Sequence, residues 1–228
     1  MKNTTLAELV RRHPLATTFL NERHIDYCCG GNSMLFESIQ AKGYETQAFL
    51  AELEQYLIEE EAKFKPTIPD DLYTMDVPSL ITHLEVTHHR DERQLFSAID
   101  EKITTILSVH YQHHKAELIE VFRLYSDLKK ELVIHFAQEE QQVFPLMQAP
   151  VTVESLAQVE ALEDDHKAAG EIIKALERAT HDFSTPSDAC PTYVATYALL
   201  KQLVEDIFLH IYKENSILFP IFEQGVNA

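Results

Sequence analysis

The 228-residue chain carries 37 acidic and 19 basic residues, for a formal net charge of −18. This balance argues against nucleic-acid binding, which needs clustered cations, and no apolar run approaches the roughly 18 residues of a membrane-spanning helix. The start lacks a signal-peptide core, and three cysteines, two of them adjacent, make no disulfide framework. We therefore expect a soluble, cytoplasmic protein without nucleic-acid or membrane partners. With only 5 glycines and 9 prolines, it should be mainly helical.

The first part of the chain is predicted to form a small helical domain. Its helices are expected at 5–12, 15–22, 33–41 and 45–63. The segment 64–72 contains Pro66 and Pro69 and has no helical period, so it is interpreted as a linker. The sequence is accordingly divided into one domain over 1–65 and a second over 73–228.

Two adjacent thiols, Cys28 and Cys29, precede a pair of glycines in the first domain. The glycines predict a tight turn that brings backbone amides close to whatever lies beyond it. Asn32 or Ser33 is expected to cap the helix that follows.

The chemistry of this thiol pair has two interpretations. A helix N-terminus just beyond Cys28 and Cys29 would lower their pKa and raise their thiolate content. They would then serve as redox or transfer thiols and react with alkylating agents faster than Cys190. The alternative is a buried cysteine pair with a packing role only. Cys190, alone in a connection between helices, is expected to be structural or incidental.

The second domain is predicted to contain four long helices. They are expected near 76–107, 113–148, 151–181 and 190–224. Pro78 fits the first turn of the first helix, where a missing amide proton costs little. The segment 182–191, with two prolines, is the expected connection before the last helix.

Two of these helices share the pattern His-x3-Glu-x4-Phe-Pro. It runs through His135, Glu139, Phe144 and Pro145, and again through His210, Glu214, Phe219 and Pro220. Residues four apart lie on one helix face, with Cβ atoms about 5–6 Å apart. Apolar residues at matching offsets place both pairs in the core-facing stripe. Burying such groups without a partner costs on the order of several kcal/mol, so the repeat predicts a pair of metals.

A lone histidine precedes each pair. His166 and His89 are both followed by apolar residues at offsets six, seven and ten. His88 is the rival of His89, because periodicity alone allows either helix face. Each half is then a helix with a lone histidine followed by a helix with a His-x3-Glu pair, which predicts a four-helix bundle with pseudo-twofold symmetry.

Other titratable residues near these positions have less defined roles. Any of Glu163, Asp165 and Asp206 could accept a hydrogen bond that orients an imidazole. The remaining His-x3-Glu spacings, His88/Glu92 and His113/Glu117, are interpreted as chance pairs. The ligand types themselves suit iron, manganese or zinc.

The combination of Tyr27-Cys-Cys-Gly-Gly31 with these histidines and glutamates resembles the iron–sulfur cluster repair di-iron proteins of the YtfE/ScdA type, over essentially the whole chain. The resemblance implies an all-α fold: a haemerythrin-like four-helix bundle preceded by a small helical domain. It implies two non-haem irons joined by an oxo or hydroxo group. The ligands carried over are His89, His135, Glu139, His166, His210 and Glu214, with the two glutamates bridging both irons.

The function implied by this resemblance is repair of iron–sulfur clusters damaged by oxidative or nitrosative stress, by supplying or mobilising iron. Partners would be damaged iron–sulfur proteins or apo-cluster acceptors, and diatomic ligands such as nitric oxide or dioxygen. A homodimer is a further possibility. No fifth ligand histidine is evident, which favours reactivity or iron exchange over oxygen storage. The alternatives are a nitric oxide or nitrite reductase, which would make the protein an enzyme, and an oxygen or redox sensor.

Overall fold

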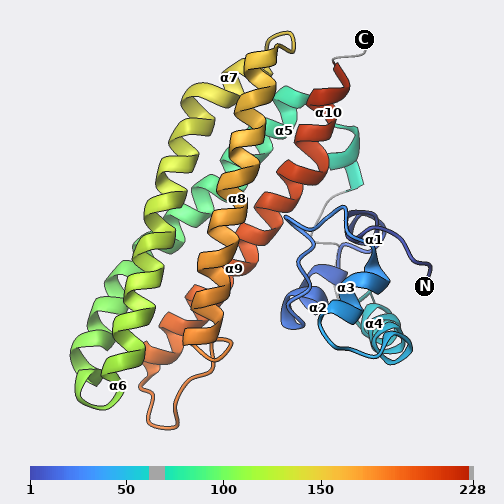
Figure 1. The fold of residues 1–228 in the computed structure, drawn as a ribbon. Coiled ribbons are helices and arrows are strands. Elements are labelled where there is room, and N and C mark those ends of the chain that lie inside the picture. The colour runs from blue at the N-terminus through green and yellow to red at the C-terminus, as the bar shows by residue number, and fades with distance from the viewer. Residues whose placement is uncertain (62–69, 226–228) are drawn as a thin grey trace. The chain divides into compact units, whose positions relative to one another are not determined.

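The computed structural model describes residues 1–61 and 70–225, which are mainly helical and contain no β-strand (Figure 1). This confirms the expected all-α class. In that part of the chain every helix is too short or too polar to cross a lipid bilayer. Most of the predicted linker falls at 62–69, outside the described residues; Asp70–Thr74 forms a short 3-10 helix, η1.

The described chain forms two compact units. The first combines Met1–Leu80 with Phe208–Gln224, and the second is built on Ile81–Ile207. The boundary between them cuts the last long helix. The division of the sequence into 1–65 and 73–228 therefore differs from these units, and it stays a prediction.

The N-terminal helices of the first unit lie where the sequence predicts them. They are α1 (Leu6–Arg12), α2 (Ala16–Glu22), α3 (Leu35–Ala41) and α4 (Thr46–Glu61). Thr5 caps α1 by accepting a hydrogen bond from the backbone N–H of Glu8 at 3.2 Å. Phe19 packs against Phe49 and Tyr56, with ring centroids 5.3 and 5.2 Å away. These aromatic contacts join α2 to α4 in one core.

The expected cap of α3 is wrong. Neither Asn32 nor Ser33 caps it; the helix begins at Leu35 after an extended Met34. The backbone here is paired with the start of the chain instead, because Leu35 N–H donates to Thr4 O and Leu6 N–H donates to Ser33 O. This pairing holds residues 33 and 34 out of the helix.

The first unit also contains the C-terminal end of the bundle's last helix. The ring of Tyr27 lies 5.8 Å from that of Tyr212 and 6.5 Å from that of Phe208. The Tyr212 hydroxyl donates to the backbone oxygen of Ala7 at 3.1 Å and lies 3.1 Å from the Tyr73 hydroxyl. Tyr27 and Tyr212 are each only 1% exposed. The N-terminal helices and residues 208–224 therefore share buried aromatic packing.

The bundle is formed by four long helical stretches. In chain order its elements are α5 (Val77–Leu84), η2 (Glu85–His89), α6 (Arg90–Gln138), η3 (Glu139–Val143), α7 (Phe144–Met147), α8 (Val153–Ala179), α9 (Pro191–Lys213), η4 (Glu214–Leu218) and α10 (Phe219–Gln224). The predicted helix ranges are confirmed to within a few residues. One difference is that the first stretch continues to residue 113 instead of ending at 107.

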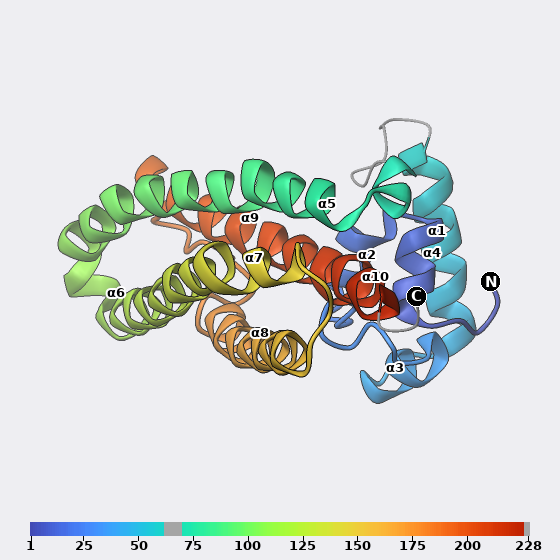
Figure 2. The same cartoon turned by 90° about the horizontal axis from the view of Figure 1, so that it is seen from above.

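Two antiparallel arms make up α6. The backbone at His114 is not helical (φ −123°, ψ 28°), and the chain reverses there (Figure 1). We call residues 90–113 the first arm and 115–138 the second arm. The Tyr125 hydroxyl of the second arm donates to Phe96 O at 3.0 Å and to the Asp100 carboxylate at 2.8 Å, which ties the arms together. Helix α8 lies beside the second arm in both views (Figures 1 and 2).

Three short π-helical turns interrupt the bundle helices. The turn η2 ends at His89. The turns η3 and η4 begin at Glu139 and Glu214. Pro145 and Pro220 explain two of them. Each proline lacks the N–H that would bond to the carbonyl four residues earlier, so the preceding turn can widen. Single π turns are frequent at functional sites.

Candidate metal centre

Glu139 lies between two histidines in the second unit. Its Oε2 is 3.3 Å from His89 Nε2, and its Oε1 is 3.2 Å from His135 Nε2. The glutamate is fully buried, as is His89, and His135 is 6% exposed. One carboxylate thus presents each of its oxygens to a different imidazole, which is the arrangement that a bridge between two metals requires.

The other three candidate ligands extend these contacts. His166 Nε2 lies 3.0 Å from His135 Nε2. On the last helix, His210 Nε2 lies 3.4 Å from Glu214 Oε1, in the same i, i+4 relation as His135 and Glu139. Glu214 is fully buried, and His166 and His210 are each 2% exposed.

The structure brings all six candidate ligands together in two groups. Within each group, one ligand atom from every member lies within 4.8 Å of the others. The groups are His89, Glu139, His210 and Glu214, and His135, Glu139, His166 and Glu214. Both glutamates belong to both groups, while each group has its own two histidines.

The chemistry of these side chains fits metal ions. Two buried carboxylates so close together repel each other, and desolvation disfavours both charges. Cations between them would offset both costs. Imidazole and carboxylate ligands suit iron, manganese and zinc.

A residue that the sequence did not single out, Glu140, positions His89. Its Oε1 lies 2.8 Å from His89 Nδ1 and also accepts from Arg93 at 2.8 Å. Burial by itself would raise the pKa of Glu140, but the hydrogen bonds from His89 and Arg93 lower it below its ordinary value. With a proton on Nδ1, His89 directs Nε2 toward Glu139. Glu140 directly follows a ligand in sequence, and nothing in the pattern distinguishes it from other surface glutamates.

Two of the three expected acceptors have defined partners. Asp165 Oδ2 lies 3.5 Å from His135 Nδ1, at the limit of a hydrogen bond. Asp206 Oδ2 lies 2.9 Å from Nδ1 of His88.

His88 and His89 are both buried but have different neighbours, and the choice of His89 as the ligand stays a prediction. His89 Nε2 lies 3.3 Å from Glu139 Oε2, whereas His88 Nδ1 lies 2.9 Å from Asp206 Oδ2. We expect His89→Ala to lower the iron content of the purified protein substantially, because one group loses an imidazole. His88→Ala should leave the visible and near-ultraviolet spectrum of the metal centre nearly unchanged. Iron analysis with absorption spectroscopy of both variants checks this, and the reverse result would move the ligand role to His88.

The turn at Cys28 and Cys29 is held by Asp26. Asp26 Oδ1 accepts from Cys29 N–H at 3.0 Å, Gly30 N–H at 3.1 Å and the Cys28 thiol at 3.3 Å. The two sulfurs are 3.9 Å apart, and both thiols are free. A Cβ on Gly30 would collide with the backbone oxygen of Asp26. The predicted tight turn is present, and glycine is needed for its close approach.

The same turn lies against η4 in the first unit. The Asn215 side-chain amide donates to Cys28 O at 3.3 Å. A Cβ on Gly31 would stand 3.1 Å from Ser216 Oγ. The residue before Asn215 is Glu214, so the thiol turn packs beside a segment that carries a candidate ligand.

The expected low pKa of the pair is wrong for Cys28. A hydrogen bond with the Cys29 thiol, burial and the nearby Asp26 carboxylate raise the pKa of Cys28 well above its ordinary value. The helix N-terminus that was expected to lower it begins only at Leu35. The Cys28 sulfur therefore stays a thiol at neutral pH.

Cys190, expected to be incidental, has the more reactive environment. A hydrogen bond from His110, together with one from the backbone N–H of Tyr193, lowers the pKa of Cys190 to about 7. Because Cys190 directly precedes α9, it lies where the amides of the first turn favour a thiolate. The environment depends on His110, eighty residues earlier in the sequence.

We expect iodoacetamide to modify Cys190 faster than Cys28 at pH 7. The rate at Cys190 should rise with pH through a midpoint near 7, because the thiolate is the nucleophile. Peptide mass spectrometry over a pH series measures both rates, and His110→Ala should shift the Cys190 midpoint upward. Faster modification of Cys28 at neutral pH would contradict these environments.

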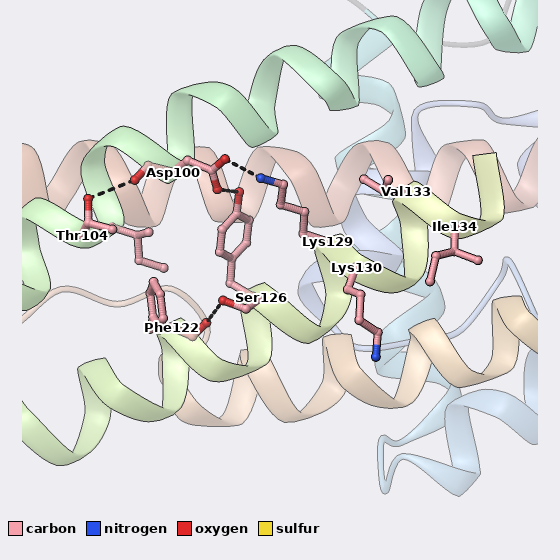
Figure 3. A pocket seen from close by; sticks show the side chains of 10 residues that line it. Asp100, Thr104, Phe122, Ser126, Lys129, Lys130, Val133 and Ile134 are labelled. Carbon is pink, nitrogen blue, oxygen red and sulfur yellow. Dashed lines mark hydrogen bonds and ion pairs between the residues drawn. The ribbon is translucent and has the colours of Figure 1, made fainter. Parts of the chain in front are cut away.

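A groove of about 490 Å³ lies elsewhere in the bundle, between the two arms of α6 (Figure 3). The Asp100 carboxylate, paired with Lys129 and Tyr125, crosses it, and Phe122, Val133 and Ile134 form its apolar part. None of the six candidate ligands lines it.

Fold and site together define a helical bundle protein with a histidine–carboxylate metal centre. Residues 80–222 match the haemerythrin HHE cation binding domain, and residues 2–57 match the ScdA_N domain, described as a domain of unknown function (DUF542). The chain is 30% identical to the iron–sulfur cluster repair protein YtfE of Enterobacter sp. (strain 638), over 96% of each chain.

Two further relatives extend this comparison. The iron–sulfur cluster repair protein ScdA of Staphylococcus haemolyticus is 27% identical over 95% of this chain and 96% of its own. The YtfE protein of Citrobacter koseri is 28% identical over 96% of both. The chain therefore belongs to the haemerythrin HHE family, and within it to the YtfE/ScdA group of iron–sulfur cluster repair proteins. The resemblance drawn from the sequence is confirmed.

Proposed function

We propose that this protein repairs iron–sulfur clusters damaged by oxidative or nitrosative stress, and that it does so by supplying iron. The observation that carries the proposal is the pair of four-residue groups that share Glu139 and Glu214. Relatives that match almost the whole chain are named iron–sulfur cluster repair proteins, which supports the same function.

The six grouped side chains would hold two non-haem irons. His89 and His210 would bind one iron, His135 and His166 the other, and both glutamates would contact both. Each iron would then have two imidazoles and two shared carboxylates from the protein. Bound iron would supply a redox-active centre with positions left for exchange or for small diatomic ligands. The protein's own part is to fix the imidazoles, as Glu140 does for His89, and to exclude water by burial.

The thiol turn would take part in transfer to the acceptor, either a damaged iron–sulfur protein or an apo-protein awaiting its cluster. Two adjacent thiols and the Asp26 carboxylate have ligand atoms within 4.8 Å of one another. Soft thiolates bind iron in clusters. The raised pKa of Cys28 supports a thiol that loses its proton only when a metal arrives.

The proposal is tested with a [4Fe–4S] protein whose cluster nitric oxide has damaged. Adding the iron-loaded protein should restore the cluster absorption and activity of that target, and metal-free protein should not. The same preparation, reduced and given nitric oxide alone, should form nitrous oxide at no more than one turnover. Many turnovers without repair would favour the reductase alternative instead.

A further inference from the structure

A third His-x3-Glu pair, His88 and Glu92, is buried in the bundle. His88 is 4% exposed and Glu92 is fully buried. Asp206 of α9 joins them, with its Oδ2 2.9 Å from His88 Nδ1. One ligand atom from each of the three lies within 4.8 Å of the others. From its spacing alone, this pair could not be distinguished from a chance pair.

The other pair with the same spacing has a different environment. His113 is exposed at the end of the first arm. Glu117 accepts hydrogen bonds from the Tyr193 and Tyr197 hydroxyls at 2.9 and 2.6 Å. Among residues 1–61 and 70–225, His88 and Glu92 belong to a group of potential metal ligands, and His113 and Glu117 do not.

The π turn η2 explains why two successive histidines are both buried. It spans Glu85–His89 and widens the helix where the two side chains leave it. His89 contacts Glu139, while His88 contacts Asp206 on α9. A regular α-helix turns about 100° per residue, so neighbouring positions do not normally share one buried face.

The charges of this group favour a cation. The group joins two carboxyl groups to one imidazole, with Glu92 wholly inside the protein. A buried carboxylate is costly to keep charged, and a divalent ion would offset that cost. One imidazole with two carboxylates is also a ligand set suited to ferrous iron or manganese.

We propose that His88, Glu92 and Asp206 form a third, mononuclear site for a divalent cation, beside the centre that would hold two irons. This assignment rests on the proposed function: the bound ion is ferrous iron that is entering or leaving that centre. The Asp206 side chain is 27% exposed, which gives the site access to solvent. With three protein ligands and partial exposure, it binds its ion more weakly than the buried six-residue centre.

Binding of Mn(II) to the site can be measured by electron paramagnetic resonance. Hydrated Mn(II) gives a sharp spectrum, and the ion loses this spectrum when it binds to the protein. The full-length protein, with its iron centre loaded and oxidised, is titrated with Mn(II), and its iron is measured before and after. We expect one Mn(II) per chain in addition to the retained iron. Glu92→Gln and Asp206→Asn should each weaken this binding at least about tenfold, the range seen when groups around a metal are lost.

Glu131→Gln is the matched control, because Glu131 lies on α6, is exposed and pairs with Lys130 at the surface. It should bind Mn(II) like the parent protein, and all three variants should keep their iron and thermal stability. If Glu92→Gln fails to fold, the Mn(II) affinity of Asp206→Asn decides whether the site exists, because Asp206 is partly exposed. Absence of the additional Mn(II), or equal affinity in Asp206→Asn and the parent, overturns the third site.

The two proposals fail separately. An additional Mn(II) that depends on Asp206, in a protein that repairs no cluster, would reject the repair function and keep the site. Repair without the additional Mn(II) would reject the site and keep the function. If both hold, Asp206→Asn should slow iron transfer to the acceptor while the iron centre itself stays intact.

Discussion

Glu139→Leu and Glu214→Leu should each remove most of the iron from the purified protein. Each glutamate belongs to both groups of candidate ligands, so each substitution would weaken the binding of both irons. The metal-free variants should meanwhile unfold at a higher temperature than the metal-free parent. In the metal-free protein the two buried carboxylates repel each other, and removing one of them relieves that repulsion and its desolvation cost. Iron analysis and thermal unfolding with and without metal measure both effects.

The combination of these two effects distinguishes a metal ligand from a glutamate that only holds the fold together. Glu131→Leu is the control, because this exposed glutamate lies on the same helix as His135. It should change neither the iron content nor the metal-free stability appreciably. Two irons per chain in Glu139→Leu, with an unchanged near-ultraviolet spectrum, would show that the carboxylate is not a bridge.

Cys28→Ser combined with Cys29→Ser should abolish most of the cluster repair and leave the bound iron in place. Serine preserves the shape of the turn, whose backbone is held by Asp26 and by Asn215. The hydroxyl cannot replace a thiolate as an iron ligand. Repair of a damaged [4Fe–4S] target and iron content are measured on the same sample.

Cys190→Ser supplies the matched control for this pair. Cys190 is the third free thiol; its pKa is lowered to about 7, whereas the pKa of Cys28 is raised. If general thiol reactivity drives repair, Cys190→Ser should lose activity; we expect it to keep full activity. Full repair by the Cys28/Cys29 double variant would reduce the pair to packing.

Removal of residues 1–65 is a poorer test of the first domain than these point substitutions. Tyr27 packs on Tyr212 and Phe208, and Ala7 accepts the Tyr212 hydrogen bond. Truncation would uncover Tyr212 and Phe208, which precede Glu214 by two and six residues. Loss of iron in such a variant would therefore not separate a catalytic thiol from lost packing.

The sequence was sufficient for the helices, and the six ligands that it predicts lie together in two groups in the structure. Apolar residues at helical spacing around His135 and His210 identified the buried face, and that face is buried in the structure. His89 and His166 are followed by apolar residues at the same offsets, and this match favoured His89 over His88. In the structure His89 contacts Glu139. Periodicity carries this information because all the positions lie on regular helix.

What the sequence did not predict depends on departures from regular helix or on distant partners. The π turn at Glu85–His89 buries His88 as well as His89, and a period of 3.6 residues cannot describe that. The low pKa of Cys190 requires His110, which only the fold brings near. The pKa of Cys28 was misjudged because its causes, a hydrogen bond with the Cys29 thiol, burial and the Asp26 carboxylate, depend on the folded turn.

The central claim, that this protein supplies iron for cluster repair, is tested most directly by following the iron. The protein is loaded with ⁵⁷Fe and mixed with a [4Fe–4S] target that was prepared with ⁵⁶Fe and then damaged by nitric oxide. Mössbauer spectroscopy of the reisolated target reports the source of the iron in its rebuilt cluster. We expect ⁵⁷Fe in that cluster and a matching loss from the protein. A rebuilt cluster containing only ⁵⁶Fe, with all ⁵⁷Fe still on the protein, would contradict the claim.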